Sequence, residues 1–211
     1  MKRLPQGAPA WLETAEVPSD EADLRQPLVA EVADLVWLAN IAALELHVPL
    51  WRAPAWERPT HVVLDLDPGP PAGLLACCEV ALVVRDVLDA AGLRAGAKVS
   101  GGKGLHVLVP TGGSATAAQT RAFARAVAEV VAAQHPTRVV ATIGKAERAG
   151  KVLVDWNQND VKRTMIAPWS LRGSAPSPRV ALPVAWEEIE AAVAARTSVA
   201  LEVGPDAARA R

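Results

Sequence analysis

The pattern of hydrophobic and polar positions changes character near residue 60. Before it, residues 27–46 carry apolar side chains at helical spacing, which predicts a helix. Residues 1–27 are rich in proline, alanine and acids and are expected to be irregular, and residues 47–60 are expected to form a loop. The chain therefore predicts an N-terminal helical and irregular module, followed by a more regular body.

Strand and helix patterns follow one another through that body. Strands are expected at 61–67, 97–100, 105–110 and 151–156, and helices at 72–91 and 114–134. The order strand, helix, strand, strand, helix, strand is the split βαβ pattern of the RRM or ferredoxin-like fold. The predicted fold class is α+β, with a βαββαβ core on which the N-terminal module packs. In this topology the first strand lies between the third and the fourth.

Length and composition are those of one domain with a sizeable core, because the 211 residues are 51% hydrophobic and 21% charged. We divide this domain into an N-terminal module (1–59), a core (60–195) and a C-terminal tail (196–211). Cys77 and Cys78 are adjacent, which argues against an ordinary disulfide and favours reduced core residues in the cytoplasm. No secretory signal or membrane partner is expected.

Charge is distributed unevenly along the chain. The formal net charge of −1 argues against a protein that coats nucleic acid. Residues 138–179 nevertheless hold eight Lys or Arg against three Asp or Glu, whereas residues 1–67 hold five against eleven. The basic window could face phosphates, or it could be a solvated basic face.

Carboxylates end two of the predicted strands. Asp65 and Asp67 alternate in DLDP and so point to the same face of the first strand, and Asp155 ends the last strand. Such carboxylates would repel one another unless cations compensate, and hard divalent ions such as Mg²⁺ or Mn²⁺ prefer carboxylate oxygens. Two such ions are typical of phosphoryl transfer. The simpler alternative is that DLDP is only an exposed strand end before a turn.

A glycine-rich segment precedes the third strand of the core. SGGKGLH at 100–106 lets the backbone approach a ligand closely, and it offers backbone N–H groups, Ser100, Lys103 and His106 to an anion. It is not a Walker A loop, because a strand and not a helix follows it. Ser100 and Lys103 have the S-x-x-K spacing, but the glycines make the required helix improbable. A plain hairpin turn with a core histidine is the alternative.

Several motifs, in order, resemble the polymerase domain of bacterial ATP-dependent DNA ligase D, a primase-polymerase of the archaeo-eukaryotic primase superfamily. They are ELH at 45–47, DLDP at 65–68, SGGKGLHV at 100–107, VDWNQN at 154–159 and TMIAPWSLR at 164–172, and the resemblance spans about residues 28–190. It implies the catalytic core of that superfamily and a metal-dependent nucleotidyltransferase. This enzyme would add nucleotides from NTP or dNTP substrates to a primer, with a preference for ribonucleotides and good activity with manganese, filling gaps during non-homologous end joining.

The resemblance also implies roles for individual residues. Asp65, Asp67 and Asp155 would be catalytic and would bind two Mn²⁺ or Mg²⁺ ions. The nucleotide-binding residues would be Ser100, Lys103, His106 and Arg172. Further residues that would line the site are His47, Lys145, Arg148 and Asn159. Implied partners are primer-template or gapped DNA, nucleoside triphosphates, the protein Ku and a DNA ligase.

The chain departs from the family pattern at its N-terminus. The family has a longer segment there, with lysines that bind a 5′-phosphate and an aromatic residue that stacks on the nucleotide or template. This chain begins near the family's P-x-W region, has no tyrosine and has one phenylalanine, Phe123. What the resemblance implies therefore does not extend to 5′-phosphate recognition or to part of the base platform. No ligase or nuclease motif is found, so end joining would require other proteins.

Two other functions are compatible with the same residues. One is a non-catalytic nucleic-acid-binding module on this fold. The other is a different two-metal phosphotransferase or a nuclease, which three aspartates would serve equally well.

Overall fold

The computed structural model describes residues 4–19, 24–142, 145–173 and 177–211. Within these residues a six-stranded sheet has the order β12-β5-β6-β4-β8-β7, with every neighbouring pair antiparallel except β8 and β7. The strands are β4 (His61–Pro68), β5 (Gly96–Val99), β6 (Leu105–Pro110), β7 (Val139–Val140), β8 (Val152–Asp155) and β12 (Pro183–Val184). The inner order β5-β6-β4-β8 confirms the predicted ferredoxin-like arrangement. Short strands that the sequence pattern did not reveal extend both edges.

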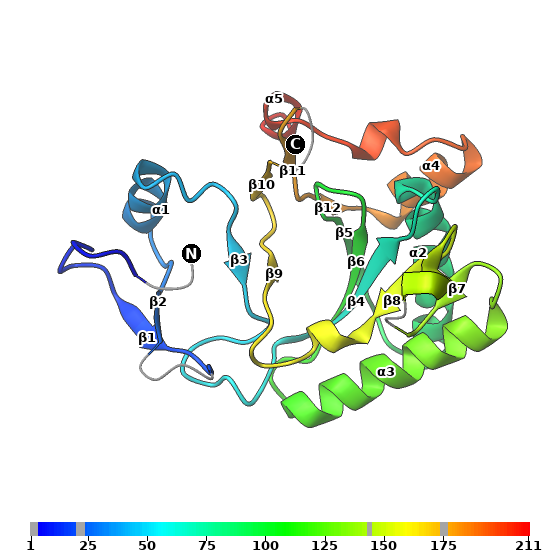
Figure 1. Cartoon of the computed structure of the whole chain (residues 1–211), viewed down its shortest axis with the longest axis horizontal. Helices are drawn as coiled ribbons and strands as arrows, with labels where there is room; N and C mark the ends of the chain where they lie inside the picture. The colour runs from blue at the N-terminus through cyan, green and yellow to red at the C-terminus, as the bar shows by residue number, and fades with distance from the viewer. Residues whose placement is uncertain (1–3, 20–23, 143–144, 174–176) are drawn as a thin grey trace.

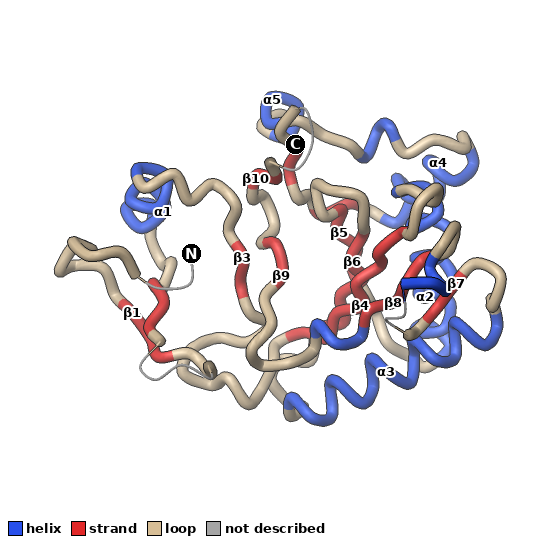
Figure 2. The backbone as a smooth tube through the Cα atoms, in the orientation of Figure 1, coloured by secondary structure: helices blue, strands red, loops and turns tan. Residues whose placement is uncertain are grey.

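Two long helices, α2 (Leu74–Ala90) and α3 (Ala117–Gln134), cover one face of this sheet (Figures 1 and 2). Buried positions of α2 recur at helical spacing, and α3 buries a similar stripe of small and β-branched residues. On β4 the residues that face these helices are Val62, Leu64 and Leu66. Cys77 and Cys78 are both buried with free thiols, as expected of core residues. This apolar layer fixes which face of each strand is left for polar side chains.

The N-terminal module is more regular than expected. Residues 14–16 and 25–27 form a hairpin, β1 (Thr14–Glu16) and β2 (Arg25–Pro27), in a segment that was expected to be irregular. The helix α1 (Val32–Asn40) is shorter than the predicted 27–46. It starts where the Asp34 carboxylate accepts the N–H groups of Ala30 and Glu31, and it ends before Ala42, which has a φ of 57°.

A second strand pair joins β3 (His47–Val48) of the N-terminal module to β9 (Met165–Ile166), and it lies between α1 and the sheet (Figure 1). The chain leaves β9 into β10 (Leu171–Arg172), which pairs with β11 (Arg179–Val180). The remaining elements are the helices α4 (Trp186–Ala194) and α5 (Pro205–Ala208) and the 3₁₀ turns η1 (Lys145–Arg148), η2 (Trp156–Gln158) and η3 (Val199–Leu201). In the part of the chain that is described, no helix is both long and apolar enough to cross a membrane.

Candidate functional site

The face of the sheet away from α2 and α3 carries a row of polar residues. Strand register pairs Lys98 with His106, His106 with Asp65, and Asp65 with Asp155. Directly opposed residues point to the same side of a sheet, so these four residues are neighbours across β5, β6, β4 and β8. The predicted strand adjacency is confirmed. His106 was expected beside Asp67, but it stands opposite Asp65 because the strands pair two residues further from the end of β4.

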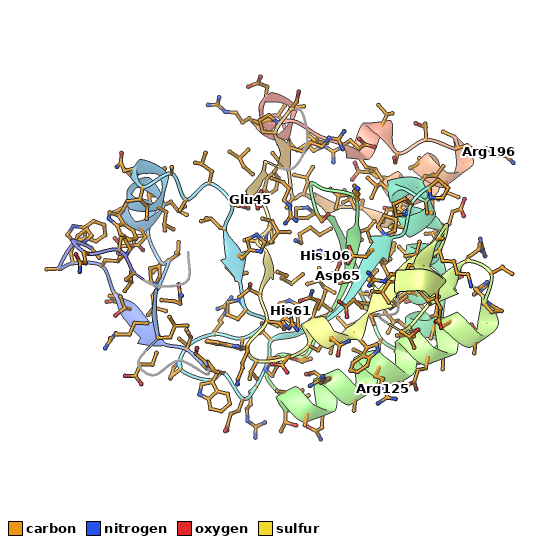
Figure 3. The ribbon with its side chains drawn as sticks, viewed as in Figure 1. Glu45, His61, Asp65, His106, Arg125 and Arg196 are labelled. Atoms are coloured by element: carbon orange, nitrogen blue, oxygen red, sulfur yellow. The ribbon has the colours of Figure 1, made fainter. Side chains whose placement is uncertain are left out.

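Asp65 and His106 lie side by side on the side of the sheet that faces β9 (Figure 3). The Nε2 atom of His106 is 3.4 Å from Oδ1 of Asp65, and the two side chains are only 6% and 15% exposed. Burial holds the pKa of His106 well below its usual range, helped by the positive charges of Lys98 and Arg172. At neutral pH this histidine is therefore uncharged and does not neutralise the neighbouring carboxylates.

The carboxylates carry a surplus of negative charge. Burial, followed by repulsion from Asp67 and Asp155, raises the pKa of Asp65 to about 8, although Lys98 and Arg172 oppose the shift. Burial and Asp155 likewise raise the pKa of Asp67. Elevated pKa values mean that the side chains around these acids do not fully compensate two or three negative charges in one place. Hard divalent cations would supply the missing positive charge.

Asp155 joins this row at the end of β8. Its Oδ1 atom accepts the N–H of Asn157 at 2.9 Å and so starts the turn η2. Among the residues described, no three His, Cys, Asp or Glu side chains stand as a ready-made metal-binding group. The strand register nevertheless places Asp155 directly opposite Asp65, and oxygen donors of this kind fit Mg²⁺ or Mn²⁺.

The glycine-rich segment forms a tight turn between β5 and β6. The Ser100 hydroxyl oxygen accepts the N–H groups of Gly102 and Gly104, each at 3.2 Å, so part of the expected N–H cradle is directed inward. Gly101 has a φ of 71°, and a Cβ atom there would lie 3.0 Å from Cβ of Arg172. A Cβ on Gly104 would lie 2.5 Å from the Leu66 carbonyl oxygen. These glycines are therefore needed to bring the turn against β4 and β10.

Basic side chains surround the carboxylates. Arg172 and Arg148 both lower the pKa of Asp67, against the larger effect of burial. A cavity of about 370 Å³ is lined by Asp67, Lys103, Arg148 and residues 68–70 and 149. Within the described residues, three buried side-chain nitrogens lack a hydrogen-bond partner: Nδ1 of His106, Nε of Arg148 and Nε of Arg172. The two unsatisfied guanidinium N–H groups, next to acidic groups, are suited to an anion that arrives with its own cations.

Glu45 connects two of the predicted site residues. Its carboxylate accepts the Gly173 N–H at 2.8 Å, lies 4.0 Å from Nε of Arg172 and lies 3.5 Å from Nε2 of His47. The backbone N–H of Gly173 is the main reason that the pKa of Glu45 is lowered, so the residue is ionised at neutral pH. The sequence pointed to His47 and Arg172, and it gave Glu45 only as part of the ELH motif.

The structure gives other predicted residues different surroundings. Asn159 is 3% exposed, and its amide bonds the backbone N–H and carbonyl of Val63 at 2.9 and 2.7 Å, so it ties η2 to β4 instead of lining an open site. The Trp156 ring packs on the core with the guanidinium groups of Arg121 and Arg125 over it, at 5.4 and 5.3 Å. Lys145 begins η1, but its side chain lies outside the described part of the structure.

Lys98 faces the site and was missed at the sequence level, because one lysine in a short strand is typical of an exposed position. It is 2% exposed, and its Nζ donates to the Ile166 carbonyl at 2.6 Å. Burial lowers the pKa of this lysine to about 8, while Asp65 favours its charged form. The available signal was the register, which predicts a side chain on the same face as His106.

Comparison with known proteins identifies the relatives of this chain. The family model described as "LigD, primase-polymerase domain" matches residues 1–209. The chain belongs to this family. A polymerase domain of Mycobacterium tuberculosis ligase D, solved in complex with DNA, is similar with a TM-score of 0.81 and 38% identity, over 89% of this chain and 68% of that one. The predicted primase-polymerase fold and nucleotidyltransferase class are thereby confirmed.

Curated members of the LigD primase-polymerase family are much longer proteins. The multifunctional non-homologous end joining protein LigD of Mycolicibacterium smegmatis is 38% identical over 190 residues, which are 89% of this chain and 25% of that protein. The protein with the same description from Pseudomonas aeruginosa is 35% identical over 158 residues, which are 74% of this chain and 18% of that protein. The chain thus spans about a quarter or less of the length of these relatives.

Proposed function

We propose that this chain is a divalent-metal-dependent polymerase that adds nucleotides to a primer 3′-hydroxyl during non-homologous end joining. The observation that carries the proposal is the strand register, which places Asp155 and His106 on either side of Asp65. Asp67 lies two residues further along the same strand. Family membership supports the reaction class. The supported reaction is attack of the primer hydroxyl on the α-phosphate of a nucleoside triphosphate, with pyrophosphate leaving.

The carboxylates of Asp65, Asp67 and Asp155 would hold the cations. When bound, two divalent ions would lower the pKa of the attacking hydroxyl and neutralise the charge on the leaving oxygens. The residues of the chain itself supply position. Because the deprotonated forms of Asp65 and Asp67 are disfavoured by burial and mutual repulsion, the acids are prepared to exchange protons for metal ions.

Cationic and neutral donors would orient the triphosphate. Arg148 and Lys103 line the cavity beside Asp67, and Arg172 reaches the same acids from β10. The Ser100 oxygen already accepts two backbone N–H groups, so its own proton remains to be donated to a phosphate oxygen. His106 would act as a neutral donor because its pKa is lowered. Fixed donors of this type stabilise charge that develops in the transition state.

The proposed substrate is gapped or primer-template DNA, and the similar polymerase domain was solved in complex with DNA. The window 138–179 supplies excess positive charge for a nucleic-acid backbone, so binding would weaken as salt is raised. Ku and a DNA ligase are the proposed partners, because the similar proteins are named for end joining. Gap filling would leave a nick that a ligase must seal.

The test measures primer extension on gapped DNA with Mn²⁺, with and without a 5′-phosphate. Release of pyrophosphate is measured in the same reactions. The proposal predicts extension by the unmodified protein and its loss in Asp155→Ala, with an unchanged circular dichroism spectrum. DNA binding without extension would instead favour a non-catalytic binding module. Release of mononucleotides from DNA would favour a nuclease.

A further inference from the structure

Lys98 reaches from the catalytic sheet to a different part of the fold. Its Nζ donates to the carbonyl oxygen of Ile166 in β9, and Ile166 stands opposite His47 in the β3–β9 pair. One side chain of the sheet is therefore attached to the strand pair that carries His47. In Figure 2 the pair stands on the side of the sheet away from α2 and α3, with a space between the two backbones.

A lysine is an expensive choice for this position. Taking an ammonium out of water costs several kcal/mol unless an opposite charge and hydrogen bonds compensate. The neighbouring residues of β5, Ala97 and Val99, face the apolar core and carry no polar group. Lys98 instead has Asp65 as an attractive charge in the same row and the Ile166 carbonyl as an acceptor. The ammonium group, and not the apolar stem, therefore makes the interactions that explain a lysine at this position.

Two other hydrogen bonds next to the strand pair hold it together internally. The Ala167 N–H donates to the Leu46 carbonyl at 2.8 Å, and the Leu46 N–H donates to Ser170 Oγ at 2.8 Å. These bonds join β3 to β9 and to the segment that follows β9. They do not join either strand to β5 or β6. In the described part of the chain, the Lys98 ammonium bonds β5 directly to β9 beside His47. The flanks of the pair are tied down separately, by the Thr60 N–H to the Leu50 carbonyl and the Trp169 N–H to the Ala181 carbonyl.

We propose that Lys98 is a positioning residue that holds the β3–β9 pair, and with it His47, over the carboxylates of the sheet. The contact that holds the ammonium in place is the hydrogen bond to the Ile166 carbonyl. The expected effect on the KM for the nucleoside triphosphate rests on the proposed polymerase function. The attachment of the strand pair to the sheet does not depend on that function.

The test compares Lys98→Met, which removes the ammonium at similar length, with Lys98→Arg, which retains a cationic donor. Lys151→Met is the matched control, because Lys151 Nζ also donates to a backbone carbonyl, that of Pro136, at 2.7 Å. Hydrogen exchange of the Ala167 amide should accelerate about tenfold in Lys98→Met, while the Val63 amide changes less than about threefold. The KM for the nucleoside triphosphate should rise about tenfold with a smaller change in kcat, and Lys98→Arg should restore much of both.

The proposal is overturned if Ala167 exchange in Lys98→Met matches that of the unmodified protein and of Lys151→Met, and if its KM matches that of the unmodified protein. If Lys98→Met fails to fold, Lys98→Met combined with Asp65→Asn removes both charges and is compared with Asp65→Asn alone. Faster Ala167 exchange in the double variant supports the proposal, and equal exchange overturns it. Absence of extension by the unmodified protein would contradict the polymerase function, whereas the exchange comparison would still decide the role of Lys98.

Discussion

Alternate residues of β4 serve the two faces of the sheet. Val62, Leu64 and Leu66 are at most 3% exposed and pack against the helices, whereas Asp65 and Asp67 lie on the opposite face with raised pKa values. The first set gains stability from burial. The second set costs stability, because charge is concentrated there before any cation arrives. The comparison shows one strand separating folding from chemistry by the alternation of its side chains.

The largest expected effect comes from the polar face. Asp67→Asn keeps the shape of the side chain but removes a charge from the proposed metal site, so primer extension should fall on the order of a thousandfold, equivalent to several kcal/mol of transition-state stabilisation. Thermal unfolding without metal should occur at an equal or higher temperature, because a repelling charge has been removed. Loss of activity together with a large loss of stability would contradict the separation of the two faces.

A loss of stability without a loss of activity is expected for a residue of β4 that faces the core. Leu64 is 0% exposed in the core, and Leu64→Ala should lower the free energy of unfolding by about 2–5 kcal/mol through lost burial and an added cavity. Denaturant unfolding measures this cost. The kcat of the fraction that remains folded should stay close to that of the unmodified protein, and a selective loss of kcat would count against the comparison.

The loss of folding stability caused by the acids of the polar face should depend on pH. The pKa of Asp65 rises from about 4 in the unfolded chain to about 8 in the fold, so the folded state binds more protons between these values. In the presence of EDTA, stability should therefore decline as pH rises from about 4 to about 8. Melting temperatures measured across this range should fall less in Asp65→Asn. A parallel decline in both proteins would show that Asp65 is not the source.

The smallest effect is expected at the edge of the site. Glu45 and His47 are 38% and 40% exposed, so the interactions of the Glu45 carboxylate with His47 and Arg172 are screened by water. Glu45→Gln should raise the KM for the nucleoside triphosphate about threefold with little change in kcat. Steady-state extension kinetics at low and high salt would measure it, and a large kcat effect would assign Glu45 a direct part in the reaction.

Periodicity was sufficient to predict the ferredoxin-like core, because each of its strands and helices is long enough to show a period. It did not predict β7 and β12, since two-residue strands such as Val139–Val140 have no measurable period and exist only through pairing. The helix α1 was overestimated because the apolar residues before Glu31 and after Asn40 continue its spacing while the backbone turns away. These errors arise where tertiary contacts override local pattern.

The acidic residues of the candidate site could be predicted from the sequence. The residues that hold its strands and turns in place, Lys98 and Asn159, could not. Asp65 and Asp155 could be placed on adjacent strands from topology, and the structure confirms that adjacency. Lys98 could not be recognised, because only the register shows that its strand position faces His106. The engagement of Asn159 with Val63 depends on contacts 96 residues apart in sequence, which no local motif encodes.

The most direct test of the account is a Mn²⁺ titration followed by electron paramagnetic resonance, on the unmodified protein and on Asp155→Asn. The account predicts that the unmodified protein binds Mn²⁺ and that the substitution on β8 weakens binding at least about tenfold, since one carboxylate of the shared site is lost. Equal Mn²⁺ affinity in both proteins, with the variant folded, would contradict the claim that acids from β4 and β8 form one divalent-cation site.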